Sequence, residues 1–369
     1  MAKEEKKAPK LRFNGYTNDW ERKELNNILK INSGRDYKQL NSGSIPVYGT
    51  GGYMLSVNDK LSDTDAVGIG RKGTIDKPLY LKAPFWTVDT LFYCTSKENS
   101  DVKFIYLLFQ IINWKRYDES TGVPSLSKNT ISNIKTYVPK IKEQDYISKL
   151  FFSLDNTLQL HERKYEELTL IKKALLQKLF PKKDGFKPEV RYKNFNDAWE
   201  QRKLGEVVER FDNLRIPVTS SKREKGITPY YGANGIQDYV QGYTHDGEFV
   251  LVAEDGANDL QNYPVHYVNG KVWVNNHAHV LQGKNKMVDN LFLVNAIKQI
   301  KIETYLVGGS RAKLNADVMM KLPIKVPTFN EQQRLGKYFA RLDSLITLHQ
   351  CKLEKLKQLK KFLLQNMFI

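Results

Sequence analysis

The chain lacks most of the features by which disulfide-rich, zinc-binding and membrane proteins are recognised. Its 369 residues include two cysteines, Cys94 and Cys351, which are too few for a disulfide framework and have no CxxC partner. A reducing, cytoplasmic location without a zinc finger is therefore expected. No apolar run approaches the roughly 18 to 20 residues that span a bilayer. Residues 1–10 carry charges but no apolar stretch, so we expect no signal peptide.

Motifs of catalysis are scarce as well. The sequence contains no Pro-Pro pair, hence no Asn/Asp-Pro-Pro-aromatic motif to hold a flipped base, and no GxxxxGK[ST] loop for ATP. Its one GxGxxG match, residues 68–73, is followed by Thr-Ile-Asp-Lys-Pro rather than a helix, which favours a strand and turn. Asp19, Glu21 and Lys23 imitate a nuclease cluster, but a matching segment later in the chain has Ala198 in place of Asp19. We expect no catalytic residue, metal site or cofactor in this chain.

What is abundant is positive charge. Lys and Arg number 58 against 41 Asp and Glu, which gives a formal charge of +17 and a pI near 9.5. Such an excess attracts polyanions, and nucleic acid is the leading partner. The apolar content of 41% and aromatic content of 11% are those of a folded protein.

The sequence also contains an internal repeat. Residues 331–368 repeat residues 143–180, and both copies share Glu-Gln, Leu-Asp, Leu-His and Leu-Leu-Gln at a constant offset. The phrase at residues 191–204 repeats that at 12–25, and the Pro/Gly/Lys stretch 181–188 reads as a linker. This pattern predicts four segments, namely 1–140, 141–182, 183–328 and 329–369.

The first and third segments predict mixed α+β domains. Short apolar runs broken by Gly, Asn and Pro, such as YGTGGY at 48–53 and its match YGANGI at 231–236, are typical of strands. Helical turns are expected around 105–114 and 289–300. The two copies agree mainly at glycines and at tryptophans such as Trp20 and Trp199, which we interpret as scaffold.

The second and fourth segments predict long helices. Each helix of about 35 residues would extend some 50 Å, and its single narrow apolar stripe requires a partner, for which its own repeat is the obvious choice. Thr328 and Glu331 could form a capping box at the second helix. Apolar residues and two histidines step by three and four along a predicted helix-pair seam: Leu150, Leu154, Leu158, His161, Leu168, Leu175, Leu335, Phe339, Leu342, Ile346, His349, Leu353, Leu356 and Leu363.

The seam histidines, His161 and His349, admit two interpretations. They could form a polar layer that sets the register of the helix pair, or a metal or pH-switch site. Neither has a second histidine close in sequence, which favours the polar layer.

Four phrases resemble one known family. These are WEQRKLGEVVERF (199–211), YYGANGI (230–236), GGSRAKLNADVMMKLPIKVP (308–327) and EQQRLGKYFARLD (331–343). From residue 11 to 368 the chain resembles the specificity (S) subunit of a type I restriction-modification enzyme. That resemblance implies two target-recognition domains, each reading one part of a split, asymmetric site on double-stranded DNA.

The resemblance also implies an assembly. The two helices would pair as an antiparallel coiled coil with pseudo-twofold (circular) symmetry, space the two domains and dock two modification subunits, which restriction subunits then join. S-adenosylmethionine, ATP and Mg would be bound by those partner subunits rather than by this chain.

Candidate DNA contacts follow from residue type and loop position, since Lys and Arg bind phosphates while Arg, Lys, Asn, Gln and Tyr also read base edges. Arg311 and Lys313 align with the neutral Val123 and Ser125, a difference that fits a domain-specific contact. The candidates are Lys38, Tyr48, Arg71, Lys72 and Lys128 in the first domain, and Lys222, Arg223, Lys225, Tyr231, Asn234, Arg311 and Lys313 in the second.

Other functions remain open at the level of sequence. The chain could be the DNA-reading portion of another restriction enzyme, a non-catalytic coiled-coil scaffold for acidic partners, or a dimeric transcription regulator. A DNA-recognition subunit should prefer particular DNA sequences, whereas a scaffold should show no sequence preference. The dimeric regulator is less favoured, because two unlike DNA-reading domains in one chain would bind an asymmetric operator without a second copy of the chain.

Overall fold

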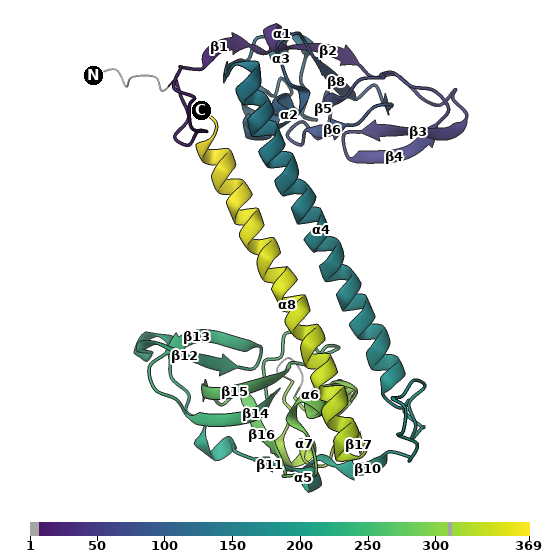
Figure 1. Ribbon diagram of the computed structural model, residues 1–369, viewed down its shortest axis with the longest axis vertical. Helices are drawn as coiled ribbons and strands as arrows, with labels where there is room; N and C mark the ends of the chain where they lie inside the picture. The colour runs from purple at the N-terminus through teal and green to yellow at the C-terminus, as the bar shows by residue number, and fades with distance from the viewer. Residues whose placement is uncertain (1–6, 309–311) are drawn as a thin grey trace. The chain divides into compact units, whose positions relative to one another are not determined.

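The computed structural model describes residues 7–308 and 312–369. Contacts divide the chain into two compact units: unit 1 holds Met1–Glu162 and Cys351–Ile369, and unit 2 holds Arg163–Gln350. Helix α4 (Ile141–Leu179) and helix α8 (Phe329–Asn366) each begin in one unit and end in the other (Figure 1). A unit therefore combines one α+β domain with one end of each long helix. Within the described residues, no helix is long and apolar enough to cross a membrane.

The α+β domain of unit 1 contains three small sheets. A two-stranded sheet pairs the first strand of the domain with its last, a four-stranded sheet has the order β2-β8-β5-β6, and a three-stranded sheet has the order β4-β3-β7. The strands are β1 (Glu21–Glu24), β2 (Leu29–Ser33), β3 (Ser42–Gly49), β4 (Gly52–Val57), β5 (Ala66–Gly70), β6 (Leu79–Leu81), β7 (Trp86–Thr87), β8 (Leu91–Ser96) and β9 (Lys135–Val138).

Short helices complete this domain. The helix expected around 105–114 is α2, and its first turn is capped by the Asp101 carboxylate, which accepts a 2.7 Å hydrogen bond from the Phe104 amide. The GxGxxG match runs along buried β5 into a turn, as predicted. The helices are α1 (Leu25–Ile28), α2 (Val102–Ile111), the 3-10 turn η1 (Trp114–Tyr117) and α3 (Lys128–Ser132).

The α+β domain of unit 2 repeats this plan with one larger sheet. A two-stranded sheet again closes the domain, and the other strands form a six-stranded sheet of order β11-β16-β14-β15-β12-β13. The strands are β10 (Glu200–Lys203), β11 (Val208–Arg210), β12 (Lys225–Gly232), β13 (Gly235–Val240), β14 (His245–Ala253), β15 (Val265–Val274), β16 (Ala278–Gly283) and β17 (Pro323–Val326). The helices are α5 (Leu204–Val207), η2 (Asp212–Leu214), η3 (Ser220–Lys222), α6 (Asn290–Lys298), η4 (Ile302–Tyr305) and α7 (Ala316–Met319).

The larger sheet of unit 2 is held together by one strand that is divided in unit 1. Strand β15 pairs antiparallel with β14 and parallel with β12. In unit 1 these pairings are shared between β6, which pairs with β5, and β7, which pairs parallel with β3. Pro84 lies between β6 and β7 and has no N–H to donate to a ladder, so the strand is interrupted there. Both domains combine sheets with short helices, so the predicted α+β class is confirmed.

Each core is centred on a repeated tryptophan. In unit 1 the buried Trp20 ring meets Phe104 of α2 edge-on at 6.0 Å and Phe368 at 6.2 Å. In unit 2 the buried Trp199 ring meets Phe292 of α6 at 5.7 Å and Phe180 at 5.5 Å.

Packing in the two cores explains why both long-helix segments end in a phenylalanine. Phe180 follows α4 and packs in unit 2, whereas Phe368 follows α8 and packs in unit 1. Each long helix therefore ends in the core of the domain that precedes the other helix in the chain.

Within each unit the two long helices lie side by side. In unit 1, Lys360 of α8 pairs with Asp155 of α4 at 2.6 Å, and Lys357 pairs with Glu162 at 3.7 Å. In unit 2, Lys172 of α4 pairs with Asp343 of α8. Rising numbers on one helix meet falling numbers on the other in unit 1, which is the antiparallel sense.

The predicted seam residues all lie at buried or partly buried positions. By contrast, Leu160, Leu170 and Leu348, which fall between seam positions, are exposed by 55%, 67% and 47%. His161 belongs to unit 1 and His349 to unit 2. The seam positions are Leu150, Leu154, Leu158, His161, Leu353, Leu356 and Leu363 in unit 1, and Leu168, Leu175, Leu335, Phe339, Leu342, Ile346 and His349 in unit 2.

The repeated Glu of the Glu-Gln phrase anchors each long helix to its domain. Arg12 Nε and Nη2 donate to the two Glu143 carboxylate oxygens at 2.6 and 2.8 Å, and Arg191 does the same to Glu331 at 2.8 and 2.7 Å. Within the described residues no side-chain hydrogen bond joins Thr328 to Glu331, so the capping box expected there is wrong, and Glu331 binds Arg191 instead.

The glutamine of the phrase fastens the same helix start. Gln144 donates to the Pro139 carbonyl at 2.8 Å and accepts from the Asp101 amide at 3.0 Å. Gln332 repeats both bonds, to the Pro327 carbonyl at 2.9 Å and from the Asp289 amide at 3.0 Å.

Candidate nucleic-acid interface

Two loops of unit 1 that are distant in sequence lie side by side at the end of β5. The Arg71 and Lys72 amides donate to the Thr90 carbonyl at 2.8 and 3.3 Å, and the Arg71 carbonyl accepts from the Leu126 amide at 2.9 Å. Lys72 and Ser125 form an isolated β-bridge. These bonds bring three of the candidate cations, Arg71, Lys72 and Lys128, to the rim of one pocket.

This pocket, which we call the basic pocket, has a volume of about 490 Å³. Phe92 on β8 is buried, and the Arg71 guanidinium carbon and the Lys128 ammonium lie 5.9 and 5.8 Å from the centre of its ring. The pocket is lined by Ser33, Arg71, Lys72, Phe92, Ser125, Leu126, Ser127 and Lys128. Among the residues that the structure describes, no carboxylate pairs with Arg71, Lys72 or Lys128.

The other candidates of unit 1 lie elsewhere. Lys38 is exposed in the loop between β2 and β3. Tyr48 on β3 is partly buried, meets Tyr53 edge-on at 6.4 Å, and accepts a backbone hydrogen bond from Val88 at 3.0 Å. Its ring contributes to two small hydrophobic clusters, so packing accounts for this side chain.

Backbone pairing identifies which residues of unit 2 occupy the positions of the basic pocket. The Leu314 amide donates to the Glu254 carbonyl at 2.7 Å, as the Leu126 amide does to Arg71. Asp255 and Lys313 form the bridge that corresponds to Lys72 and Ser125. Glu254 therefore replaces Arg71, Asp255 replaces Lys72, and Lys313 replaces Ser125.

A histidine stands where unit 1 has Phe92. His279 on β16 pairs with Val252, two residues before Glu254, as Phe92 pairs with Ile69, two residues before Arg71. The same place on the scaffold thus carries cations and an aromatic ring in unit 1 and carboxylates and an imidazole in unit 2.

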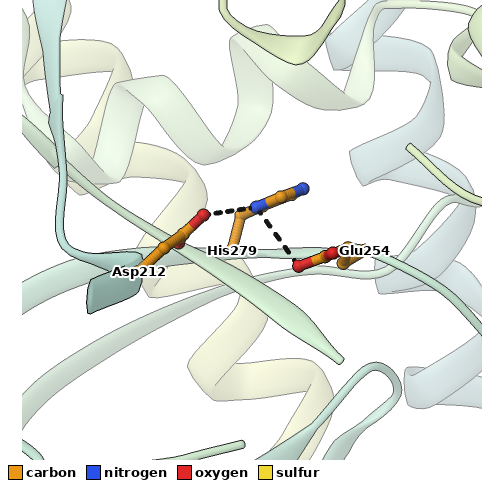
Figure 2. Close-up of side chains that lie close together, drawn as sticks. All are labelled: Asp212, Glu254 and His279. Atoms are coloured by element: carbon orange, nitrogen blue, oxygen red, sulfur yellow. Dashed lines mark hydrogen bonds and ion pairs between the residues drawn. The ribbon is translucent and has the colours of Figure 1, made fainter. Parts of the chain in front are cut away.

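Asp212, Glu254 and His279 form a compact cluster in unit 2 (Figure 2). His279 Nδ1 lies 2.7 Å from Asp212 Oδ2 and 3.6 Å from Glu254 Oε2, and Nε2 lies 2.8 Å from the Leu314 carbonyl oxygen. Both ring nitrogens of the buried histidine thus lie within hydrogen-bond distance of oxygen atoms.

Two further cations surround this cluster. Arg215 Nη1 lies 2.6 Å from Glu254 Oε2, and Lys313 Nζ lies 2.8 Å from Glu254 Oε1. Burial is the largest single influence and raises the pKa of Asp212 and of Glu254. At Asp212 the hydrogen bonds from His279 and the Val280 amide, together with the charges of His279 and Arg215, outweigh burial and lower the pKa. At Glu254 the hydrogen bonds from Lys313 and Arg215, together with the charges of His279 and Arg215, do the same.

The ligand atoms of Asp212, Glu254 and His279 lie within 4.8 Å of one another, close enough to hold a metal ion. Their donor set does not fit one, because Arg215 and Lys313 already neutralise the carboxylates and a metal would have to displace them. We interpret the cluster as an ion-pair network that ties η2, the end of β14 and β16 to residue 314. No sequence motif indicates this cluster, since its members are spread along the chain and only the pairing of the strands brings them together.

Two more candidates of unit 2 make internal contacts. The Arg223 guanidinium carbon lies 4.1 Å from the centre of the Tyr230 ring, and Arg223 pairs with Asp238 at 3.4 Å. The Asn234 side chain donates to the Gly256 carbonyl and accepts from the Asn258 amide, both at 2.9 Å.

The remaining candidates of unit 2 differ in exposure. Tyr231 is partly buried, and burial raises the pKa of its hydroxyl. Lys222 and Lys225 are exposed. Arg311 lies outside the described residues. The structure therefore gathers Arg71, Lys72 and Lys128 into one pocket, whereas Arg223, Asn234 and Lys313 make contacts within unit 2.

Comparison with known proteins places this scaffold in a family. The type I restriction modification DNA specificity domain matches the chain twice, over residues 17–170 and 196–358. These matches cover most of the chain, and the protein belongs to this family.

Individual relatives agree with this assignment. A Haemophilus influenzae protein that carries the provisional name of type I restriction enzyme specificity subunit is 45% identical over 146 residues, which are 40% of this chain and 38% of that protein. The type I restriction enzyme MjaVIII specificity subunit of Methanocaldococcus jannaschii is 24% identical over 281 residues, 67% of this chain and 64% of that one. The matched regions thus span less than two thirds of the length of these relatives.

The crystal structure of the type I restriction-modification system S subunit from M. genitalium has the same fold. It superimposes with a TM-score of 0.79 over 98% of this chain and 99% of that chain, at 16% sequence identity. The fold is thus shared although few residues are.

Proposed function

We propose that the chain is a DNA-binding specificity subunit that reads a bipartite, asymmetric DNA site and directs the modification and restriction subunits of a type I restriction-modification complex. The observation that carries this proposal is one family domain present twice, with different polar residues at equivalent positions of the two copies. A shared scaffold with opposite charges at one place suits two domains that recognise two different DNA segments.

In this proposal the chain performs no chemistry itself. Two modification subunits dock on the paired helices, restriction subunits join them, and S-adenosylmethionine, ATP and Mg are bound by those partners in the cytoplasm. The formal charge of +17 supports DNA as the ligand, and the neutralised carboxylates of the Asp212 cluster supply no open metal position for hydrolysis.

The direct test is co-expression of the full chain with the modification subunit, followed by genome-wide methylation calling. We expect a methylated motif of two unlike parts separated by bases of any identity. A continuous or palindromic motif, or no methylation from an active modification subunit, would contradict the proposal.

A domain exchange makes the test specific to each unit. Strands β10 and β17 pair with each other at the two ends of the unit 2 domain, as β1 and β9 do in unit 1, so residues 200–326 and 21–138 are closed modules. Replacing either module by that of a relative should change one part of the motif and leave the other, and each exchange is the control for the other. A change in both parts, or in neither, would refute separate reading by the two units.

The scaffold alternative is distinguished by a competition assay at fixed salt concentration. A scaffold for acidic partners would bind all duplexes equally, whereas a specificity subunit prefers duplexes that carry the methylated motif.

A further inference from the structure

The polar side chains that line the basic pocket of unit 1 are three cations and three hydroxyls, with no carboxylate among them. Arg71 presents a planar fork of N–H groups, and Lys72 and Lys128 present ammonium groups. In the described part of the chain, the hydroxyls of Ser33 and Ser125 make no hydrogen bond, so they can also donate. A ligand for this pocket must supply several acceptor oxygens and negative charge, and a phosphate does both.

The carboxylates near the pocket are already satisfied by the loop that carries them. Asp118 Oδ1 accepts from the Ser125 amide at 2.9 Å and the Ser120 amide at 3.0 Å, and Glu119 accepts from the Ser127 hydroxyl at 2.8 Å. Hydrogen bonds from Ser125 and Ser120 lower the pKa of Asp118. Within the described residues, these groups form no ion pair with the cations of the pocket.

The Phe92 ring lies close to two of the cations of the pocket. Attraction between the Phe92 ring and the positive groups of Arg71 and Lys128 favours positions over the ring, although the distances of 5.9 and 5.8 Å make each interaction weak. The cations remain exposed to solvent, so an incoming phosphate need not break an ion pair to reach them.

Unit 2 differs in charge at the equivalent place. Glu254 and Asp255 stand where unit 1 has Arg71 and Lys72, and Lys313 binds the Glu254 carboxylate at 2.8 Å. A phosphate approaching this surface would meet carboxylates and a lysine that is already engaged by one of them.

We propose that the basic pocket binds a phosphate group of the DNA backbone, and that unit 2 makes no matching contact, so the two units hold the backbone differently at equivalent positions. This proposal rests on the proposed function, because it takes DNA as the source of the phosphate. A phosphate contact positions unit 1 on the duplex without selecting bases.

The test compares two variants of the full chain with equal charge. The pocket variant carries Arg71→Gln, Lys72→Met and Lys128→Met. The control variant carries Lys60→Met, Lys135→Met and Lys149→Met, which remove three exposed lysines of unit 1 that each pair with a carboxylate. Affinity for a duplex of arbitrary sequence is measured over a salt series by fluorescence anisotropy.

We expect the pocket variant to bind DNA roughly 10- to 100-fold more weakly, and the slope of log K against log salt to become shallower by about 0.9 for each phosphate that the variant no longer neutralises. The control variant should keep the wild-type slope, and the methylated motif should be unchanged in both. The double variant Lys72→Met, Lys128→Met, which keeps Arg71, repeats the measurement if the triple variant has a lower urea midpoint.

Three outcomes overturn the proposal and are distinguishable. Equal slopes and affinities for the pocket variant and the wild type mean that the pocket does not contact the backbone. An unchanged slope with an altered methylated motif means that the pocket reads bases. Wild-type protein that binds no duplex refutes the proposed function itself, and the phosphate contact with it.

Discussion

The ion pair between Arg191 and Glu331 provides a direct test of how each long helix is anchored. The side chain of Glu331 is 1% exposed and that of Arg191 13% exposed, and two hydrogen bonds of 2.8 and 2.7 Å join them. Replacing Arg191 by Met would leave a carboxylate in the interior without its cation. We expect this to cost about 3 to 5 kcal/mol, the usual loss when one partner of a buried pair is removed.

The double variant Arg191→Met, Glu331→Leu separates the two contributions. Replacing both partners by apolar groups removes the buried charge, so most of the stability should return. Because the protein has two units, the transition is followed by hydrogen exchange resolved by segment rather than by one global midpoint.

The duplicated pair is the matched control. Arg12→Met leaves the buried carboxylate of Glu143 without its cation in the same way. Because Arg12 and Glu143 both belong to unit 1, it should lower the hydrogen-exchange protection of unit 1 and leave that of unit 2 unchanged. A destabilisation below about 1 kcal/mol for Arg191→Met, or a double variant as unstable as the single one, would refute the anchoring role.

Three further predictions concern other parts of the chain. The pKa values of Asp212 and Glu254 are lower in the folded protein than their unfolded values of 3.8 and 4.5. Their contribution to stability is therefore present above the unfolded values and is lost as the pH falls through the folded values. In Asp212→Asn the urea midpoint should fall less steeply with decreasing pH than in the wild type. Phe368→Ala should cost unit 1 about 3 to 5 kcal/mol, and Phe180→Ala should cost unit 2 the same, by hydrogen exchange. Inserting four residues near Leu168 adds about 6 Å of helix. The stretch of bases of any identity between the two parts of the methylated motif should then lengthen by about two base pairs. A stretch of unchanged length in the methylome would contradict this expectation.

Charge at equivalent positions separates the two units more clearly than any motif does. Arg71 and Glu254 occupy the same point on the scaffold, and each offers its backbone carbonyl to the same partner position. Because the backbone interaction is kept while the side chain changes sign, the scaffold is independent of what the surface binds. This independence supports the proposal that one fold carries two specificities.

The long helices and the repeat were predictable from sequence because their signals are local. A three-and-four spacing of leucines defines one face of a helix whatever it packs against, and the exposed Leu160 and Leu170 lie off that face. The short helices α2 and α6 were likewise predicted near their observed positions.

Pairings between distant residues were not predictable. Lys313 reads as a free cation in the sequence, yet Glu254, far earlier in the chain, binds it. Asn234 reads as a loop residue open to DNA, yet both polar groups of its side chain bind the backbone at Gly256 and Asn258. In both cases a side chain suited to DNA finds a partner inside the domain, and only the fold brings that partner close.

The sequence by itself determined the duplication, the α+β domains and the paired helices, because periodicity and repeated motifs are properties of the chain, and its motifs were enough to show a resemblance to the family. The tertiary structure decided which charges are used internally. It brought Arg71, Lys72 and Lys128 together in one pocket and placed Asp212, Glu254 and His279 in an ion-pair network (Figure 2). Electrostatic interactions depend on distance in space, and the distance between residues far apart in the chain is set only when the sheets form.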